Sequence, residues 1–235
     1  MKYIIIGKGK LGGQVVGCLP EGDVLAVCDR ANPPTVDLLK KAGAVIVCVP
    51  ADGFEAILPV LMESQVPAVI ATTGYVWNDQ LQSLVRSKKL RWIVGSNFSL
   101  GMNLAFFFAC ELGKLMRSLP RAFSGANLSI HEVHHVHKKD SPSGTALSLA
   151  RACKMGSIPI VADREGEVIG IHHLKLQLPH EMFTISHEAQ DRAIFAEGAI
   201  WAAQELLPNV GPGITFFEEL VQQQFQESLT NQLTN

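Results

Sequence analysis

Short apolar runs alternate with longer segments of mixed polarity through about the first hundred residues of the chain. The runs are rich in valine, isoleucine and alanine, as buried parallel strands are. We expect strands at residues 3–6, 24–28, 44–49, 68–71 and 90–94. We expect helices between them at residues 14–19, 33–41, 54–64 and 79–88. This alternation predicts an α/β fold with a doubly wound parallel sheet.

The pattern changes at residues 95–103, which are small, polar and glycine-containing, and we place a domain junction there. A helical run at 104–119 follows. Further strands are expected from residue 128 and at 158–161, 164–171, 172–178 and 181–187, before a helix at 193–206. Strands divided by turn residues favour an open antiparallel or mixed sheet. Residues 99–191 are therefore predicted to form a second, α+β domain, and residues 1–98 the first.

Composition limits the function classes. The 235 residues are 47% hydrophobic and 18% charged, with a net charge of −2. This balance describes a globular protein and excludes a disordered or nucleic-acid-coating one. No segment has the length of a membrane span, and the apolar run at the N-terminus is too short for a signal peptide. Five scattered cysteines indicate reduced thiols, so we expect a cytoplasmic protein without nucleic-acid or membrane partners.

A glycine motif directly follows the first expected strand. Gly7, Gly9 and Gly12 form a GxGxxG pattern that opens a helix. Gly7 allows a tight turn, Gly9 allows a pyrophosphate to approach the backbone, and Gly12 allows close packing of helix and strand. Asp29 ends the second strand, where an acidic residue grips the ribose of NAD. A Rossmann-type dinucleotide site is predicted, and a glycine turn without cofactor is the alternative.

The charges around this motif bear on the choice of cofactor. The Asp29 carboxylate repels a 2′-phosphate, whereas Arg30, Lys8 and Lys10 attract one. We favour NADH without excluding NADPH. The cofactor contacts expected from this part of the chain are Gly7, Gly9, Lys10, Leu11, Gly12, Asp29 and Arg30.

Residues 130–147 carry the candidate chemistry. Four of the eight histidines lie here, at positions 131, 134, 135 and 137, and Lys138 and Lys139 follow them. Ser143 is a suitable N-cap for a helix, and free amides at a helix start attract anions. Imidazoles beside such a site can exchange protons near neutral pH. The pattern favours an anion-binding catalytic site; a zinc site and a solvated polar strand are the alternatives. We predict no metal, because the two lysines oppose a divalent cation.

The stretch also resembles a known family. Residues 132–146 read Glu-Val-His-His-Val-His-Lys-Lys-Asp-Ser-Pro-Ser-Gly-Thr-Ala and are similar to the signature of dihydrodipicolinate reductase, also called 4-hydroxy-tetrahydrodipicolinate reductase. The resemblance implies an oxidoreductase of lysine and diaminopimelate biosynthesis that reduces a cyclic dicarboxylate with NADH or NADPH. It implies that His134 and Lys138 are catalytic. The substrate would be held by His135, Gly144 and Thr145.

Other segments resemble the same family. Thr72, Thr73 and Gly74 match a Thr-Thr-Gly near the nicotinamide, and Asn97 and Phe98 match a junction motif near the cofactor. Matches at residues 164–172 and 187–199 give His172 and Arg192 no role that we can derive. By analogy the segment 192–235 returns to the nucleotide domain, which makes that domain discontinuous.

The resemblance also implies a homotetramer built through the second domain. The chain is short for the family after Asp29 and after Cys153, which makes the assembly less secure than the chemistry. Two alternatives to the reductase remain: another two-domain NAD-dependent dehydrogenase, such as one acting on aspartate, and a non-catalytic NAD-sensing protein.

Overall fold

The computed structural model describes residues 1–233 and divides into two compact units. The first comprises Met1–Ser99 and Arg192–Gln224, and the second comprises Leu100–Asp191 and, within the described residues, 225–233. The sequence placed residues 192–235 together in the nucleotide domain, whereas the contacts group 225–233 with the second unit, and residues 234–235 lie outside the described part of the chain. That the first unit binds the nucleotide and the second binds the substrate stays a prediction.

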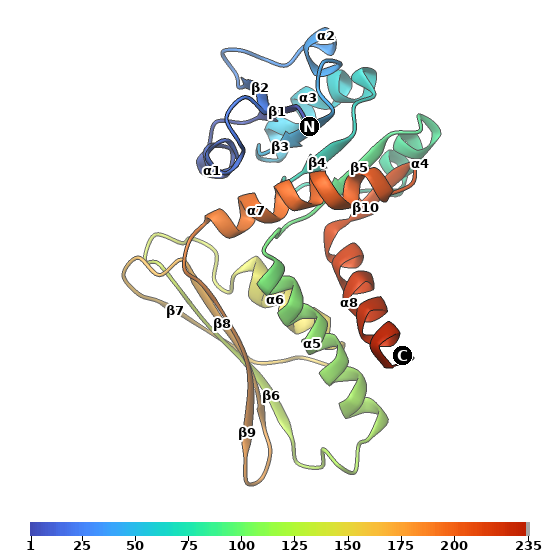
Figure 1. Ribbon diagram of the computed structural model, residues 1–235. Coiled ribbons are helices and arrows are strands. Elements are labelled where there is room, and N and C mark those ends of the chain that lie inside the picture. Colours follow the sequence, from blue (N-terminus) through green and yellow to red (C-terminus); the bar gives the residue numbers. More distant parts are fainter. Residues whose placement is uncertain (234–235) are drawn as a thin grey trace. The chain divides into compact units, whose positions relative to one another are not determined.

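The first unit is a six-stranded parallel sheet in the order β10-β5-β4-β3-β1-β2. Its strands are β1 (Tyr3–Ile6), β2 (Val24–Cys28), β3 (Ala44–Val47), β4 (Ala68–Ile70), β5 (Arg91–Val94) and β10 (Gly213–Phe216). Ile4 and Ile5 point to opposite faces of β1 and are both fully buried. The sheet is therefore covered on both faces, and Figure 1 shows the helices that cover it.

The helices of this unit confirm the doubly wound arrangement. They are α1 (Lys10–Cys18), α2 (Val36–Leu39), α3 (Ala51–Ser64), α4 (Asp79–Ser87) and α7 (Ala193–Trp201). A π-helical turn at Ala202–Leu206 and a 3-10 turn at Leu207–Asn209 continue α7, and α8 (Phe217–Leu233) follows β10. The chain passes from β1 to β2 on one side and then to β3 on the other side of β1. Ligands of such sheets bind at this reversal, beyond the carboxyl ends of the strands.

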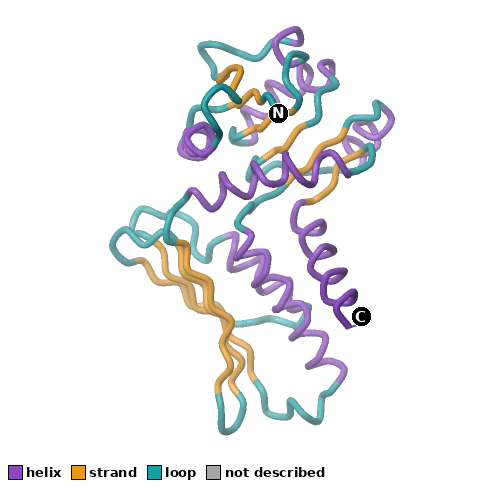
Figure 2. Tube along the Cα trace, viewed as in Figure 1, coloured by secondary structure: helices purple, strands orange, loops and turns teal. Residues whose placement is uncertain are grey.

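The second unit is a mixed sheet with two helices. The strand order is β7-β6-β8-β9, with β6 and β7 parallel and the other pairs antiparallel. The elements are α5 (Leu100–Ser118), β6 (Asn127–His134), α6 (Gly144–Cys153), β7 (Ile160–Arg164), β8 (Gly170–Gln177) and β9 (Met182–Ala189). Phe106 of α5 and Leu149 of α6 pack with Ile130 and Leu174 of the sheet. Figure 2 shows the long strands beside the two helices.

Both parts of the predicted fold class are confirmed, although one expected strand was wrong and one observed strand was not predicted. Residues 164–171 do not form one strand: β7 ends at Arg164, and a turn with Gly166 at φ 43° leads to β8. Strand β10 was not expected, because it has only four residues and begins with a glycine at φ 137°. Its partner β5 is far away in sequence, so only the tertiary fold creates it.

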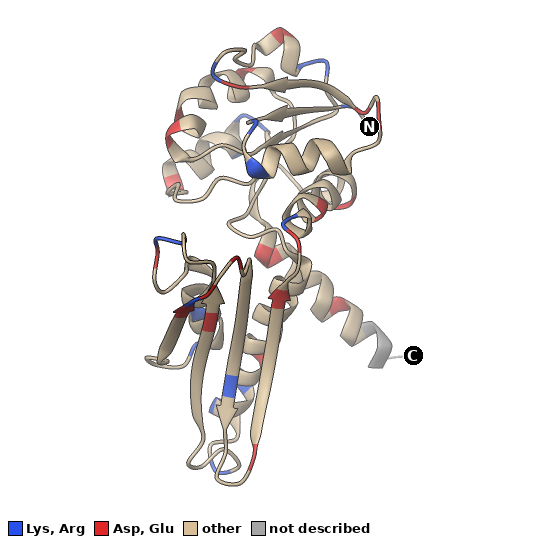
Figure 3. Ribbon diagram, turned by 90° about the vertical axis from the view of Figure 1, so that its left-hand side faces the viewer, with Lys and Arg blue, Asp and Glu red and all other residues tan. Residues whose placement is uncertain are grey.

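Two features of the described residues bear on possible partners: the length and polarity of the helices, and the distribution of charged residues. No helix within residues 1–233 is long and apolar enough to cross a membrane. Figure 3 shows acidic and basic residues scattered over each unit, as the net charge of −2 leads one to expect.

The packing of α1 on β1 gives a test with a matched control. A Cβ added at Gly12 would lie 1.9 Å from the backbone oxygen of Gly7, whereas one at Gly13 would meet no described atom within 4 Å. Gly12→Ala should lower the free energy of unfolding by about 1–3 kcal/mol, as overpacking does. Gly13→Ala should leave it unchanged or raise it by up to about 1 kcal/mol, because alanine favours the helix. Urea unfolding followed by circular dichroism measures both, and equal effects would contradict the packing.

Candidate functional site

The candidate site of the second unit is built around Glu132, near the end of β6. Residues alternate between the two faces of a strand, so Ile130, Glu132 and His134 share one face. Ile130 belongs to the core beneath α5 and α6, and the Glu132 side chain is fully buried. A carboxylate in this position requires hydrogen-bond donors around it.

Ser143 supplies two of those donors. Its backbone amide donates to Oε1 of Glu132 at 2.8 Å, and its hydroxyl donates to Oε2. The same hydroxyl oxygen accepts from the amide of Ala146 at 3.0 Å, so Ser143 is the N-cap of α6, as the sequence predicted. Arg164, at the end of β7, places its guanidinium 3.6 Å from Oε1. The carboxylate therefore ties the start of α6 to β6 and β7.

Two histidines face the same carboxylate. Nδ1 of His134 lies 3.4 Å from Oε2 of Glu132, and Nε2 of His172 lies 3.5 Å from that oxygen. The two rings are 5.0 Å apart at 77°. Burial lowers the pKa of His134, while Glu132 opposes this shift and Lys138 adds to it. Burial and neighbouring histidines lower the pKa of His172 to about 3, so this ring is neutral at physiological pH.

The turn between β6 and α6 already holds a carboxylate. Nζ of Lys138 lies 2.9 Å from Oδ1 of Asp140. The Asp140 carboxylate also accepts hydrogen bonds from its own amide and from the amide of Gly144, the first residue of α6. Burial raises the pKa of Asp140, but the bond from Lys138 and these amides outweigh it and hold the pKa below its usual value. Lys138 and the helix start thus form a carboxylate-binding position.

The structure separates the remaining residues of this stretch. His135 and Thr145 are half-buried near the same turn, and Gly144 is exposed. His131 lies on the other face of β6, where it contacts Asp163 at 2.8 Å. His137 is exposed, 3.8 Å from Glu167. Only His134, of the four clustered histidines, faces Glu132 within salt-bridge distance among the described residues.

In the first unit the glycine loop has the packing that its spacing indicates. Gly7 has φ 114°, and a Cβ there would lie 2.5 Å from the backbone oxygen of Cys48. Gly12 packs against Gly7, and a Cβ at Gly9 would meet no described atom within 4 Å. Leu11 is half-buried and Lys10 is exposed at the start of α1. The loop leaves open the backbone that is predicted to meet a pyrophosphate.

Asp29 stands at the end of β2, at the same edge of the sheet. Its Oδ2 lies 2.8 Å from Nζ of Lys8, and its Oδ1 accepts from the amides of Ala31 and Asn32. The bond from Lys8 is the main cause that lowers the pKa of Asp29. Arg30 is exposed and contacts Asp52 at 3.3 Å. The aspartate and the lysine of the glycine loop are therefore neighbours.

The other predicted cofactor residues follow β4 and β5. The hydroxyl of Thr72 is buried and has no hydrogen-bond partner among residues 1–233, whereas Thr73 and Gly74 are exposed. The side chain of Asn97 accepts from the amide of Ser99 at 2.9 Å. Phe98 is buried, with its ring 4.5 Å from that of Phe217. In the described structure Phe98 is a packing residue, and its contact with a cofactor stays a prediction.

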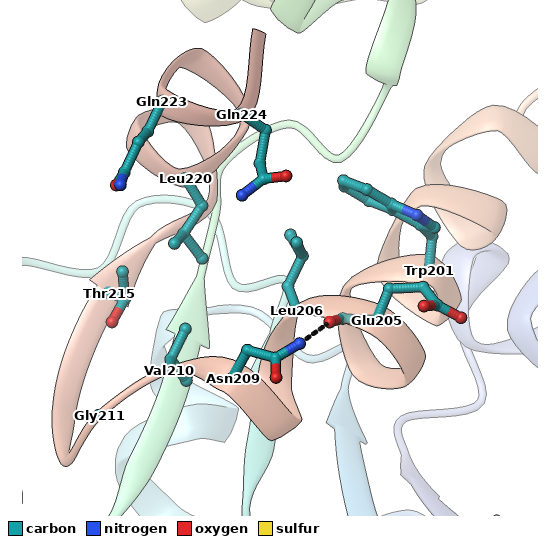
Figure 4. Close-up of a pocket in the computed structure, with 10 residues that line it drawn as sticks. All are labelled: Trp201, Glu205, Leu206, Asn209, Val210, Gly211, Thr215, Leu220, Gln223 and Gln224. Carbon is teal, nitrogen blue, oxygen red and sulfur yellow. Dashed lines mark hydrogen bonds between the residues drawn. The ribbon is translucent and has the colours of Figure 1, made fainter. Parts of the chain in front are cut away.

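A cavity of about 750 Å³ in the first unit lies away from these residues. Its lining, drawn in Figure 4, comes from the end of α7, the turn that follows it, β10 and α8. Trp201, Glu205 and Gln224 line it, and none of its described lining residues was predicted to bind cofactor or substrate. Volume alone therefore does not identify the reactive site.

Comparison with known proteins identifies the family. Residues 101–220 match the family described as dihydrodipicolinate reductase, C-terminus. A 4-hydroxy-tetrahydrodipicolinate reductase of Caldanaerobacter subterraneus subsp. tengcongensis is 32% identical over 94% of this chain and 98% of its own. The chain belongs to the dihydrodipicolinate reductase family. A second member, from Rhizobium meliloti, is 32% identical over 83% of this chain and 76% of its own.

Solved structures support the fold of this reductase family. The dipicolinate-bound dihydrodipicolinate reductase from Paenisporosarcina sp. TG-14 has a TM-score of 0.71 at 20% identity. It matches 93% of this chain and 99% of its own. Aspartate dehydrogenase from Thermotoga maritima has a TM-score of 0.52 at 10% identity and matches 89% of this chain and 98% of its own. These likenesses show a shared two-domain fold.

Sequence reasoning missed the centre of the site. Glu132 was quoted as part of the family signature but was given no role, and neither Arg164 nor His172 was assigned one. One signal was available: Glu132 alternates with His134, so both side chains had to share a face of β6. Arg164 and His172 come from β7 and β8, and only the sheet register brings them to Glu132.

The same cluster gives a test of metal dependence. Ligand atoms of Glu132, His134 and His172 lie within 4.8 Å of one another, a spacing that suits a metal ion. Arg164 and Ser143 occupy the carboxylate, and Lys138 adds positive charge nearby. We predict that catalysis needs no metal and that activity survives a strong chelator. Elemental analysis of the active protein is the check, and stoichiometric zinc whose removal abolishes turnover would overturn the prediction.

Proposed function

We propose that the chain is an NAD(P)H-dependent 4-hydroxy-tetrahydrodipicolinate reductase that acts in lysine and diaminopimelate biosynthesis. One observation carries the proposal: Lys138 and the first amide of α6 hold a carboxylate, that of Asp140, beside the buried His134. A substrate with two carboxylates suits this position. The free thiols of all five cysteines are in keeping with the reducing cytoplasm, where we place the reaction.

The 4-hydroxyl group of the substrate leaves as water to give the unsaturated dihydrodipicolinate ring, and a hydride and a proton, two electrons and two protons in all, are then added to this ring. A hydride leaves C4 of the nicotinamide and bonds to a carbon of the cyclic imine, which oxidises NAD(P)H to NAD(P)⁺. A proton is added at the neighbouring carbon. Lys138 binds a substrate carboxylate together with the amides of Gly144 and Thr145 and with His135. His134 serves the proton transfer, directly or by orienting the donor, and Lys138 is the other candidate donor.

A coupled assay tests the activity. The condensation product of pyruvate and aspartate semialdehyde is generated in place, and loss of NADH absorbance is followed. The proposal predicts turnover that depends on this product. Reduction of NAD⁺ by L-aspartate without such turnover would indicate the aspartate dehydrogenase alternative. Cofactor binding without turnover in either assay would indicate the sensing protein.

The alanine variants of His134 and Lys138 should differ in their effects on KM and kcat. Lys138→Ala removes a charge that meets substrate and transition state alike, so KM should rise, and kcat should also fall if Lys138 donates the proton. His134→Ala should lower kcat by about 10²- to 10⁴-fold, the usual contribution of a general acid, with a smaller change in KM. Steady-state kinetics measures both effects.

Two neighbouring side chains serve as matched controls. Lys139 and His137 are exposed, and their alanine variants should retain activity. NADH binding should be nearly unchanged in all four proteins, because the glycine loop and Asp29 belong to the first unit. Near wild-type kcat in His134→Ala would move the proton transfer to His135 or Lys138.

We propose NADH as the favoured cofactor and Asp29 as the acceptor for its ribose hydroxyls. The support is the place of Asp29 at the end of β2. Lys8 beside it carries the positive charge that a 2′-phosphate of NADPH would need. Asp29→Ala should weaken NADH binding more than NADPH binding, because only NADPH carries the phosphate that a carboxylate repels. Fluorescence titration of both cofactors decides this. Equal losses of affinity for the two cofactors would contradict a role for Asp29 in the site. Asp79→Ala, which changes an exposed acid on α4, is the control.

We propose a homotetramer assembled through the sheet of the second unit. Val161, Met182 and Phe183 on its strands are more than half exposed, and burial between copies would remove apolar surface from water. Light scattering at micromolar concentration should give four times the mass of the chain. A stable monomer would contradict the assembly.

A further inference from the structure

The Glu132 carboxylate is surrounded by the donors of Ser143, by a guanidinium and by two imidazoles. The amide and hydroxyl of Ser143 donate to its two oxygens, and the Arg164 guanidinium lies 3.6 Å from Oε1. His134 and His172 place ring nitrogens 3.4 and 3.5 Å from Oε2. A carboxylate accepts at both oxygens, whereas a glutamine of the same shape presents an amide nitrogen at one of them. The surroundings are therefore built for the ionised acid.

We propose that Glu132 is a positioning residue of the reductase site, which fixes the proton of His134 on Nδ1 and anchors the start of α6 through Ser143. The kinetic part of this inference rests on the proposed function. The structural part, the tautomer of His134, does not depend on it. Glu132 is buried beneath the site and acts on substrate only through His134 and Ser143.

The argument for the tautomer starts from distance. Nδ1 of His134 lies 3.4 Å from Oε2 of Glu132 and makes no hydrogen bond in the described structure, so the preference is electrostatic. A neutral imidazole with its hydrogen on Nδ1 turns the positive N–H toward the carboxylate and keeps the lone pair of Nε2 away from it. When the ring gains a second proton, that proton sits on Nε2 and is the one available for transfer. The carboxylate also stabilises the charged ring, as the third member of a Ser-His-Asp triad does.

The opposite edge of the ring faces a residue without a side chain. A Cβ added at Gly170 would lie 3.0 Å from Nε2 of His134 and 3.3 Å from its Cδ2. Gly170 is the first residue of β8, so the strand that carries His172 also leaves room for the reactive edge of His134. The carboxylate thus lies at one edge of the His134 ring and Gly170 lies at the other, so the ring is enclosed between them.

The second half of the inference concerns helix α6. The Ser143 hydroxyl donates to Glu132 and accepts from the amide of Ala146, which leaves the amides of Gly144 and Thr145 at the open end of the helix. Gly144 is the amide that meets the Asp140 carboxylate. One buried acid therefore sets both the proton-transfer ring and the anion-binding helix start.

Glu132→Gln is the direct variant, and Glu165→Gln is its control, because Glu165 is an exposed acid in the same unit. Nitrogen-15 NMR of the imidazoles reports the tautomer, and the resonances of His134 are assigned by their loss in His134→Asn. We expect the Nδ1–H form in the wild type and in Glu165→Gln, and a mixture in Glu132→Gln. A wild-type His134 with its hydrogen on Nε2 would overturn the inference, whether or not any variant folds.

Kinetics supplies the second readout, on variants that bind NADH like the wild type. Glu132→Gln should lower kcat by about 10- to 1000-fold, the range of orienting partners of a histidine, with a much smaller change in KM. Loss of the carboxylate lowers the pKa of the His134 ring, so the alkaline fall of kcat/KM should move to lower pH. Asp140, Lys138, Arg164 and His172, the other charged or titratable groups at this ring, are unchanged in the variant.

The two outcomes separate this inference from the proposed function. A wild type with the Nδ1–H tautomer but no turnover would refute the reductase activity and leave the positioning intact. Unchanged kcat and an unchanged pH profile in a folded Glu132→Gln would refute the positioning and leave the activity intact. Gly170→Ala disturbs the His134 ring from its other edge. It should lower kcat although the Glu132 carboxylate remains, and retention of full kcat would contradict the proposed positioning of the ring.

Discussion

Burial of the Glu132 carboxylate is the constraint on which the candidate site depends. An ionised acid removed from water is tolerated only where hydrogen bonds and opposite charge replace its hydration. Ser143 supplies the hydrogen bonds from the start of α6, and Arg164 supplies the opposite charge from β7. Removal of one partner from a buried ion pair typically costs about 3–5 kcal/mol, so these elements keep one arrangement. The side chains around Glu132 are held in place by that requirement.

A steric constraint has the same role in the first unit. Gly7 and Gly12 bring the start of α1 against β1 at distances that no side chain permits. All six strands are parallel, so Asp29, Thr72 and Asn97 follow strands that end at the same edge of the sheet as the glycine loop. The sheet is the rigid scaffold of this edge, and the loops that follow its strands carry the residues predicted to contact the cofactor.

Local signals were sufficient for most of this architecture. The β-branched runs, the GxGxxG loop and the Ser143 cap each depend on neighbouring residues, and the sequence predicted them. The sequence could not predict β10, which exists only because β5 offers an edge to pair with. Arg164 and His172 reach Glu132 through the register of β6 with β7 and β8, which no local pattern encodes. The carboxylate of Asp140 occupies the position beside Lys138 and the start of α6, and only the folded turn brings these groups together.

The account as a whole depends on the turn between β6 and α6 as the place where substrate binds. A crystal structure of the protein with NADH and dipicolinate tests this most directly, since dipicolinate is the ligand bound in the related Paenisporosarcina reductase. The account predicts one ligand carboxylate on Lys138 and the amides of Gly144 and Thr145, with Asp140 displaced from Lys138. Dipicolinate bound elsewhere, with the 2.9 Å contact between Lys138 and Asp140 intact, would contradict it.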